Sequence, residues 1–439
     1  MTDSGDYVGS LSAAQKIRRL PYAIAQGALN AVFCSFTFGG SVFVLFLDHL
    51  GLPKTQIGFV LSLLPFCGLL AIPAGLVVGR FGVKRTFVVA FAIRKLVMLL
   101  LVLAPIAASR GGASAASAYV SVVIFVFAIL RAIGETGYYP WFQEFVPNFI
   151  RGRFTAAQMI LTTASGAAAC WVAGYVIGHS QGSGGYQALI AVGVAFGLGS
   201  VVSTLFIPGG APIRESAGWA GYWNKVTASL RDRDFLLYLG GTGLCALGWA
   251  AFAFVPLFMR EQVGLGSASV IRLEAASLLG AIGSSLFVGR ASDRYGGRPV
   301  LLASIVAIAI LPVAWMLMPR HSPWSSPLAY GAACWWGLAG AGISIGGLRL
   351  VFSEVIPAAK TMGYTAVYYA CSGLIGGVGP LAAGRALAYS EGVKGHFLAI
   401  RLDQYTPVFV ASFLLILTGA ALYRLIGRDS PAGKQPGQD

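Results

Sequence analysis

The sequence repeats itself once, and the two copies lie 210 positions apart. The first copy reads FQEFVP from Phe142 and FTA from Phe154, and the second reads FSEVIP from Phe352 and YTA from Tyr364. A shorter match, RFGVK from Arg80, recurs as RYGGR from Arg294 at an offset of 214. A chain duplicated in this way is expected to fold into two similar halves.

The composition indicates a membrane protein. Hydrophobic residues make up 56% of the 439, charged residues only 11%, and the mean hydropathy is +0.74. A soluble domain has about 25% charged residues, so this chain has too few charges to cover a water-facing surface. The cysteines all lie in apolar stretches without CxxC or Cys/His spacing, which predicts neither disulfides nor a metal site. These cysteines are Cys34, Cys67, Cys170, Cys245, Cys334 and Cys371.

Twelve apolar stretches are long enough to cross a bilayer, which requires about 20 residues each. They are residues 22–47, 56–79, 86–108, 118–140, 154–178, 187–207, 235–259, 268–290, 299–318, 328–350, 363–387 and 405–426. Six spans per repeat is an even number, so both copies enter the membrane from the same side and form a parallel repeat. We expect an all-α membrane protein of two six-helix bundles, a plan typical of secondary transporters.

The distribution of lysine and arginine predicts that both termini are cytoplasmic. With that orientation, the inner loops and tails hold 19 of the 31 basic residues, the outer loops hold 6, and the spans hold the other 6. The net charge of +15 then reflects this bias, and binding to nucleic acid is not expected. The first residues are polar and lack the pattern of a cleavable signal peptide.

The spans divide the chain into five segments. They are a cytoplasmic N-terminal segment (1–21), an N-terminal bundle (22–207), a cytoplasmic linker (208–234), a C-terminal bundle (235–426) and a cytoplasmic tail (427–439). In the linker, Trp219, Trp223, Val226 and Leu230 have helical spacing, which fits either an amphipathic helix at the inner interface or a simple tether.

The loop motifs resemble those of the major facilitator superfamily, and the resemblance covers nearly the whole chain. The family signature G-x-x-x-D-[R/K]-x-G-[R/K]-[R/K] has a counterpart between spans 2 and 3 and another between spans 8 and 9. Its aspartate is Gly79 in the first copy and Asp293 in the second, so the charge-relay latch of the family is not expected in the N-terminal half. The resemblance implies cytoplasmic gating loops at Gly75, Arg80, Gly82, Lys84, Arg85, Gly289, Asp293, Arg294, Gly296 and Arg298.

A glycine-proline pattern that antiporters of this family have on span 5 is absent there and is approximated on span 11. Span 11 contains Gly373, Gly376, Gly377, Gly379, Pro380 and Gly384. Small residues allow close helix packing, so we expect these glycines mainly to form helix contacts. The missing proline on span 5 argues against exchange of drugs for protons.

Charged residues inside spans are the first candidates for function. Arg131 lies in the middle of span 4, and Glu135 follows one turn later on the same face. The resemblance implies a pathway lined by spans 1, 4, 7 and 10, which favours a functional role for this pair over a structural one. Arg94 and Lys95 on span 3 lie about 12 Å from the inner boundary, and we expect them to reach back to the headgroups.

Polar and aromatic residues complete the predicted pathway, because a small organic solute is usually held by aromatic walls and a few polar groups. Each of them could instead serve packing or interhelical hydrogen bonding. The candidates are Gln26, Asn30, Gln158, Trp249, Trp335, Trp336, Tyr368 and Tyr369. Glu144 and Glu354 occupy matching places at inner ends of spans, and Arg349 is near such an end, so we expect scaffold roles there, with the glutamates in contact with loop arginines.

The function that these features favour is secondary active transport of a small organic solute by alternating access, with an anionic solute and coupling to protons as the working hypothesis. The alternatives are efflux of drugs or metabolites by proton antiport, and a transporter fold that serves as a sensor or scaffold. No phosphate loop, HExxH or GxSxG occurs, which argues against an enzyme and against ATP-driven transport. We expect no cofactor or metal, a monomer in the lipid bilayer, and a bacterial inner membrane.

Overall fold

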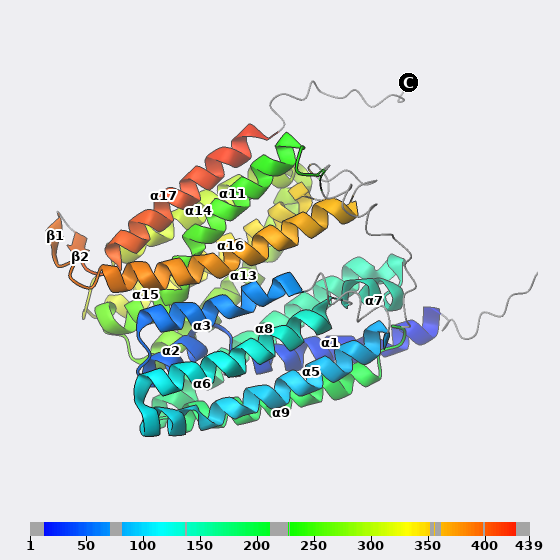
Figure 1. Cartoon of the computed structure of the whole chain (residues 1–439). Helices are drawn as coiled ribbons and strands as arrows, with labels where there is room; N and C mark the ends of the chain where they lie inside the picture. Colours follow the sequence, from blue (N-terminus) through cyan, green and yellow to red (C-terminus); the bar gives the residue numbers. More distant parts are fainter. Residues whose placement is uncertain are drawn as a thin grey trace, which may run out of the picture.

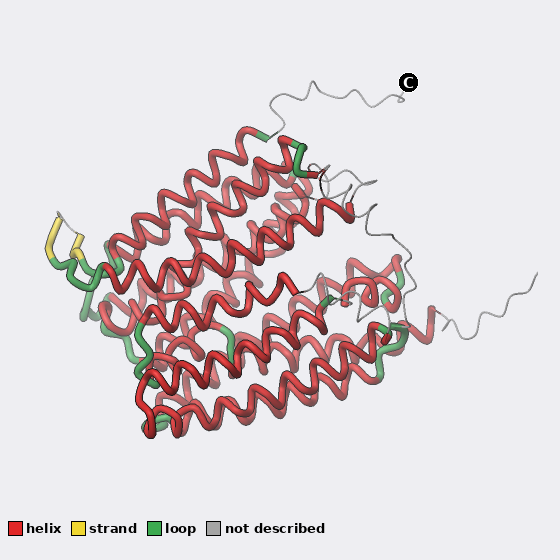
Figure 2. The backbone as a smooth tube through the Cα atoms, in the orientation of Figure 1, coloured by secondary structure: helices red, strands yellow, loops and turns green. Residues whose placement is uncertain are grey.

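The computed structural model describes residues 13–70, 81–136, 138–210, 227, 229–351, 355, 361–397 and 400–426. These residues form two bundles of helices and one short hairpin outside them (Figures 1 and 2). The hairpin joins β1 (Gly395–Phe397) to antiparallel β2 (Ile400–Leu402) and lies between the last two long helices. The N-terminal segment up to residue 12, most of the linker, Glu354 and the tail from residue 427 lie outside the described residues.

The described residues of the N-terminal half form eight α-helices. They are α1 (Ala13–Thr37), α2 (Gly40–His49), α3 (Lys54–Cys67), α5 (Val83–Leu99), α6 (Ala104–Glu135), α7 (Tyr138–Phe145), α8 (Arg151–His179) and α9 (Gly184–Leu205). The C-terminal half contains α11 (Arg233–Trp249), α12 (Val255–Phe258), α13 (Ser267–Tyr295), α14 (Gly297–Met316), α15 (Ser325–Leu350), α16 (Thr361–Tyr389) and α17 (Thr406–Leu425). Short 3-10 or π turns link several of them, including η4 (Ala250–Phe254) and η5 (Met259–Val263).

Each of the twelve predicted spans overlaps a described helix. Among the described residues, nine helical runs are long and apolar enough to cross a membrane, and one of them, Val83–Glu135, covers two predicted spans because the backbone turns at Gly112 (φ 69°). The shorter α3 and the long α16 account for the others. Span 1 is not the single helix that we expected. It breaks between α1 and α2 at Gly40, whose φ of 56° favours glycine.

The two halves are built alike, as the sequence repeat predicts. In the first half α1 packs on α8 and α9, and in the second α11 packs on α16 and α17. Likewise, α6 packs on α3 and α5, and α15 packs on α13 and α14. The first and last long helices have their free ends at the same end of the molecule, which we call the termini end (Figure 1).

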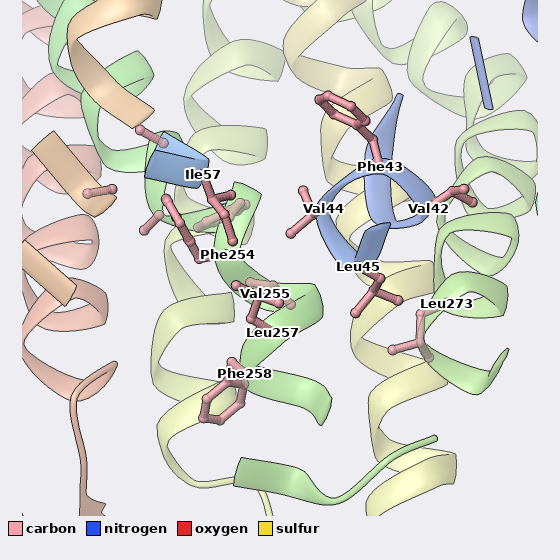
Figure 3. Packing of buried hydrophobic residues seen from close by; sticks show 14 of the residues in the cluster. Val42, Phe43, Val44, Leu45, Ile57, Phe254, Val255, Leu257, Phe258 and Leu273 are labelled. Carbon is pink, nitrogen blue, oxygen red and sulfur yellow. The ribbon is translucent and has the colours of Figure 1, made fainter. Parts of the chain in front are cut away.

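The halves are joined at the other end, which we call the hairpin end because it carries β1 and β2. There α3 packs on α16, and α8 packs on α13. The main hydrophobic core lies across this junction, since side chains of α2 and α3 pack with those of α12 and α13 (Figure 3). Burying apolar area yields about 25 cal/mol per Å², so this core favours the joined arrangement of the halves.

Candidate functional site

The N-terminal half encloses a cavity of about 600 Å³, which we call the charged cavity. Five predicted pathway residues meet there, although they come from three helices far apart in sequence: Gln26, Asn30, Arg131, Glu135 and Gln158. The other lining residues are Gly27, Phe87, Phe91, Arg94, Tyr138, Thr155, Met159, Thr162 and Thr163. Its size is that of an ordinary small-molecule site.

The ion pair predicted on α6 is formed within this cavity. Arg131 Nε donates to Glu135 Oε1 at 2.8 Å, as the spacing of four residues on one helix allows. Both side chains are partly exposed, Arg131 by 37% and Glu135 by 46%, because they line the cavity. The pair is therefore reachable by a solute.

Arg94 does not reach back to the headgroups, so the expectation for it is wrong. Its side chain is 2% exposed and its guanidinium stacks on the Phe91 ring, 3.5 Å from the centroid. Arg94 Nη1 lies 3.7 Å from Glu135 Oε1, and Nη2 donates to Asn30 Oδ1 at 3.4 Å. Arg94 Nε and Nη1 are buried without a hydrogen-bond acceptor. The guanidinium thus has unused donors beside the charged cavity.

Lys95 is also buried, contrary to the same expectation. Its side chain is fully inaccessible, Nζ donates to Asn30 Oδ1 at 2.6 Å, and the ammonium lies 3.4 Å from the centroid of the Phe33 ring. Asn30 therefore ties together two cations from α5. The rotation of α5 that turns both side chains inward is set by packing on α6 and α9, which sequence spacing does not reveal.

The charges around this cavity do not balance. Among the described residues that line it, Arg94 and Arg131 contribute two positive charges, and Glu135 is the carboxylate that faces both of them. A buried cation without a counter-ion is costly, and a ligand anion can remove that cost. The cluster is therefore suited to binding an anionic group.

Two of the predicted aromatic residues lie in a different cavity. It has a volume of about 480 Å³, lies between the halves towards the hairpin end, and we call it the aromatic cavity. Trp249 and Trp336 line it together with Phe252 and Trp315 from the same half. Glu274 on α13 also lines it and was missed by the sequence analysis, although a lone carboxylate in the apolar stretch 268–290 was a usable signal.

The remaining aromatic candidates join neither cavity. Trp335 Nε1 donates to Ala307 O on α14, and its side chain points away from Trp336 around α15. Tyr368 and Tyr369 contact one another, 5.5 Å between ring centroids, near Tyr238. The predicted site is therefore divided, with its polar members in one cavity and part of its aromatic members in another.

Basic residues of the loop motifs cap the C-terminal ends of helices in both halves. Lys84 Nζ donates to the carbonyls of Leu205 and Ile207, at the C-terminal end of α9. Its repeat counterpart Arg298 donates to the carbonyl of Arg424, at the C-terminal end of α17. Cations at helix C-termini satisfy free carbonyls and favour the helix dipole. The two motifs thus perform the same structural task.

Two glycines of these motifs begin helices, and nearby acidic residues accept hydrogen bonds. Gly82 and Gly296 start matching helices with φ of 87° and 89°, a conformation that favours glycine. Asp293 Oδ1 accepts from Arg349 Nη1 at 2.8 Å, within the C-terminal half. Glu144 Oε2 accepts from Gly210 N, a scaffold contact to the backbone, whereas the contact to loop arginines that we expected for it stays a prediction. Gly289, Arg294 and the N-terminal Arg85 are described, whereas Gly75 and Arg80 lie outside the described residues.

A family comparison identifies the fold. The family model of the Major Facilitator Superfamily matches residues 27–380. This chain belongs to the major facilitator superfamily. The members to which it is similar are transporters, which agrees with the expectation of a protein that is not an enzyme.

Known proteins of this superfamily resemble the chain in sequence or in fold. The Ectoine/proline transporter ProP of Corynebacterium glutamicum is 26% identical over 309 residues, 61% of this chain and 58% of that protein, so the match spans less than two thirds of the relative. A D-xylose-proton symporter has a TM-score of 0.71 at 13% identity, covering 94% of this chain and 98% of the other. A mutant of the nucleoside transporter NupG has a TM-score of 0.70 at 17% identity, covering 94% and 100%.

Proposed function

We propose that the protein is a secondary active transporter that moves a small organic solute by alternating access of its two halves. Membership of the superfamily and the duplicated bundles support this function. The halves are joined at the hairpin end in this structure, so the state is one that is closed there. With cytoplasmic termini, that end faces the outside.

We further propose that the charged cavity binds the solute through an anionic group, such as a carboxylate. The observation that carries this proposal is Arg94, whose buried Nε and Nη1 have no hydrogen-bond acceptor beside the Arg131–Glu135 pair. A carboxylate between Arg94 and Arg131 would accept from unused donors and balance the surplus positive charge. Gln26 and Gln158 offer further polar contacts.

Glu135 is the residue that we propose for proton coupling. It lies within ion-pair distance of both arginines, so an anionic solute that binds them competes with it. A displaced Glu135 can bind a proton in place of its arginine, which would couple the two events through a shared cation. Support comes from relatives: one is a proton symporter and another carries proline, a solute with a carboxylate.

Flux measured in proteoliposomes, with and without an imposed pH difference, tests both proposals. For Glu135→Gln we expect retained solute binding but no acceleration of uptake by the gradient. For Arg131→Ala we expect at least about tenfold weaker binding, which corresponds to about 1.4 kcal/mol. Exposed Arg110→Ala is the matched control and should behave like the native protein.

The results that would contradict the proposals are distinct. Full gradient-driven accumulation by Glu135→Gln would show that protons are coupled elsewhere. If Arg131→Ala bound the solute as tightly as the native protein, the Arg131–Glu135 pair would have only a structural role. If the native protein moved no solute at all, the fold would serve as a sensor or scaffold.

A further inference from the structure

The aromatic cavity contains a carboxylate that no cation balances among the described residues. Glu274 Oε2 accepts a hydrogen bond from Ser41 N at 2.7 Å, at the first turn of α2 in the opposite half. None of the ion pairs formed by the described residues includes Glu274. An ionised carboxylate among apolar walls is costly unless it is paired, so a cation from outside the chain would stabilise the charged form of Glu274 over the protonated one.

The walls of this cavity offer aromatic faces. Phe252 contacts Trp315 edge to face at 4.7 Å and Trp336 at 5.3 Å between ring centroids. Trp315 and Phe252 are buried, so they fix the position of the less buried Trp336. Trp faces attract organic cations, more strongly where water is excluded.

One residue that lines the cavity has an unused hydrogen-bond donor. Trp249 Nε1 is buried and has no acceptor in the described structure. Buried indole N–H groups usually find a partner, and leaving one unpaired destabilises the folded state. A ligand oxygen placed near Trp249 would supply the missing acceptor.

We propose that the aromatic cavity is a binding site for a small organic cation that also has an oxygen acceptor. The ammonium group lies against Glu274 and the face of Trp336, and the oxygen accepts from Trp249. A cavity of about 480 Å³ has room for such a ligand. This site uses no residue of the charged cavity, so it does not depend on the proposed function of Arg131 and Glu135.

A ligand bound in this cavity would also affect how firmly the two halves are held together. The lining residues come from α2 and α3 on one side, including Ser41 and Leu61, and from α11 to α15 on the other, including Glu274. A ligand that contacts both sides binds the joined arrangement more tightly than a separated one. It therefore favours the state that is closed at the hairpin end.

The test compares two probes of the same shape, choline and its uncharged carbon analogue 3,3-dimethylbutan-1-ol, by tryptophan fluorescence of the purified full chain. We expect choline to bind at least tenfold more tightly. Glu274→Gln keeps an acceptor for Ser41 N but lacks the charge, and should lose most of that preference. Trp249→Phe keeps an aromatic face, lacks the donor, and should bind choline severalfold more weakly.

Two controls separate this site from the charged cavity and from general effects. Exposed Glu391→Gln and Arg131→Ala should both bind choline as the native protein does, even if Arg131→Ala loses the transported solute. Equal affinity for the two probes, or native choline binding by Glu274→Gln, overturns the proposal. It is also wrong if choline does not bind and Glu274→Gln alters only the response of flux to a pH gradient, because Glu274 is then a proton site.

Discussion

At the scale of single residues, two buried basic side chains of the N-terminal half depend on the side-chain oxygen of Asn30. Its amide oxygen accepts hydrogen bonds from Lys95 Nζ and Arg94 Nη2, and both cations are almost inaccessible to solvent. None of the ion pairs formed by the described residues includes Lys95. Asn30 is thus the acceptor on which the buried ammonium depends.

This dependence predicts that substitutions at Asn30 and Lys95 have strongly non-additive effects on the free energy of unfolding. Asn30→Leu removes the acceptor and should lower the free energy of unfolding by about 3 kcal/mol or more, because a buried charge is left unpaired. Lys95→Met in the Asn30→Leu background should restore much of the loss, since both partners are then apolar. Thermal denaturation of the four proteins of this double-mutant cycle measures the coupling.

Exposed Lys394→Met serves as the control for the loss of a lysine and should change stability little. Strictly additive effects of Asn30→Leu and Lys95→Met would mean that Lys95 is stabilised by other groups, with the Phe33 ring as the first candidate.

Single residues were predicted well where the signal lies within one helix, and poorly where it depends on a neighbour. The spacing of Arg131 and Glu135 predicted their ion pair. The inward direction of Arg94 and Lys95 was missed, because depth in the membrane does not tell which face of α5 meets α1. Glu274 was missed for another reason, since it lies on a helix outside the expected pathway.

At the scale of elements, close packing of α3 on α16 depends on glycine. A Cβ at Gly58 would fall on the carbonyl oxygen of Pro380, and Gly384 Cα lies 3.2 Å from the same position. Gly376 on α16 contacts Pro65 of α3 in the same way. The expectation that the glycines of span 11 serve helix contacts is confirmed, and several of these contacts join the two halves.

Gly58→Ala should therefore separate α3 from α16 at the hairpin end. Overpacking of this kind costs about 1–3 kcal/mol, which would shift the balance between closed and open states by a factor of about 5 to 150. Distances between spin labels on α3 and α16 would report the shift. Gly283→Ala is the matched control, because a Cβ at this helical glycine meets nothing within 4 Å.

Unchanged label distances in Gly58→Ala would mean that α16 adjusts without opening. A similar opening in Gly283→Ala would mean that the effect comes from glycine replacement in general and not from this contact.

At the scale of the whole molecule, charged pairs between the halves support the closure at the hairpin end. Lys54 Nζ on α3 lies 2.9 Å from Glu261 Oε2, and Asp48 on α2 pairs with Arg260. Glu261 Oε2 also accepts from Tyr405 Oη at 2.8 Å, which orients the carboxylate towards Lys54. These pairs lie where the halves must separate if the molecule opens at this end.

Replacing both cations, in Lys54→Gln/Arg260→Gln, should favour the state that is open at the hairpin end. Each partly exposed pair is worth up to about 1 kcal/mol, so we expect a population shift of about tenfold for the double variant. Labelling of a cysteine placed near Ser41 would increase. Arg320→Gln should not increase it, because Arg320 pairs with Asp403 inside one half. Unchanged labelling in the double variant would mean that apolar packing alone keeps the hairpin end closed.

Orientation in the membrane is a second property of the whole molecule and stays a prediction. If the basic residues set the topology, reporters fused after Asp234 and after Asp439 should both be cytoplasmic, and one near Ser114 should be external. Opposite locations for the first two fusions would contradict six passes in each half.

The overall plan was the part best predicted from sequence, because two independent signals agreed. The apolar stretches indicated the spans, which overlap the described helices, and matching helix pairs in the two halves agree with the sequence repeat. The break at Gly40 was not predicted, since glycine is common in these spans, and only the structure shows that the Glu274 carboxylate leaves no room for a Cβ there.

The unequal distribution of charge between two similar halves has an evolutionary consequence. Arg131 and Glu135 correspond, at the repeat offset, to Ala341 and Ile345, whereas the end-capping cations Lys84 and Arg298 are present in both copies. The caps thus belong to the ancestral unit, and the ion pair distinguishes its two descendants. On the proposed function, one copy therefore carries the ligand chemistry at these positions, and the other has small or apolar side chains there.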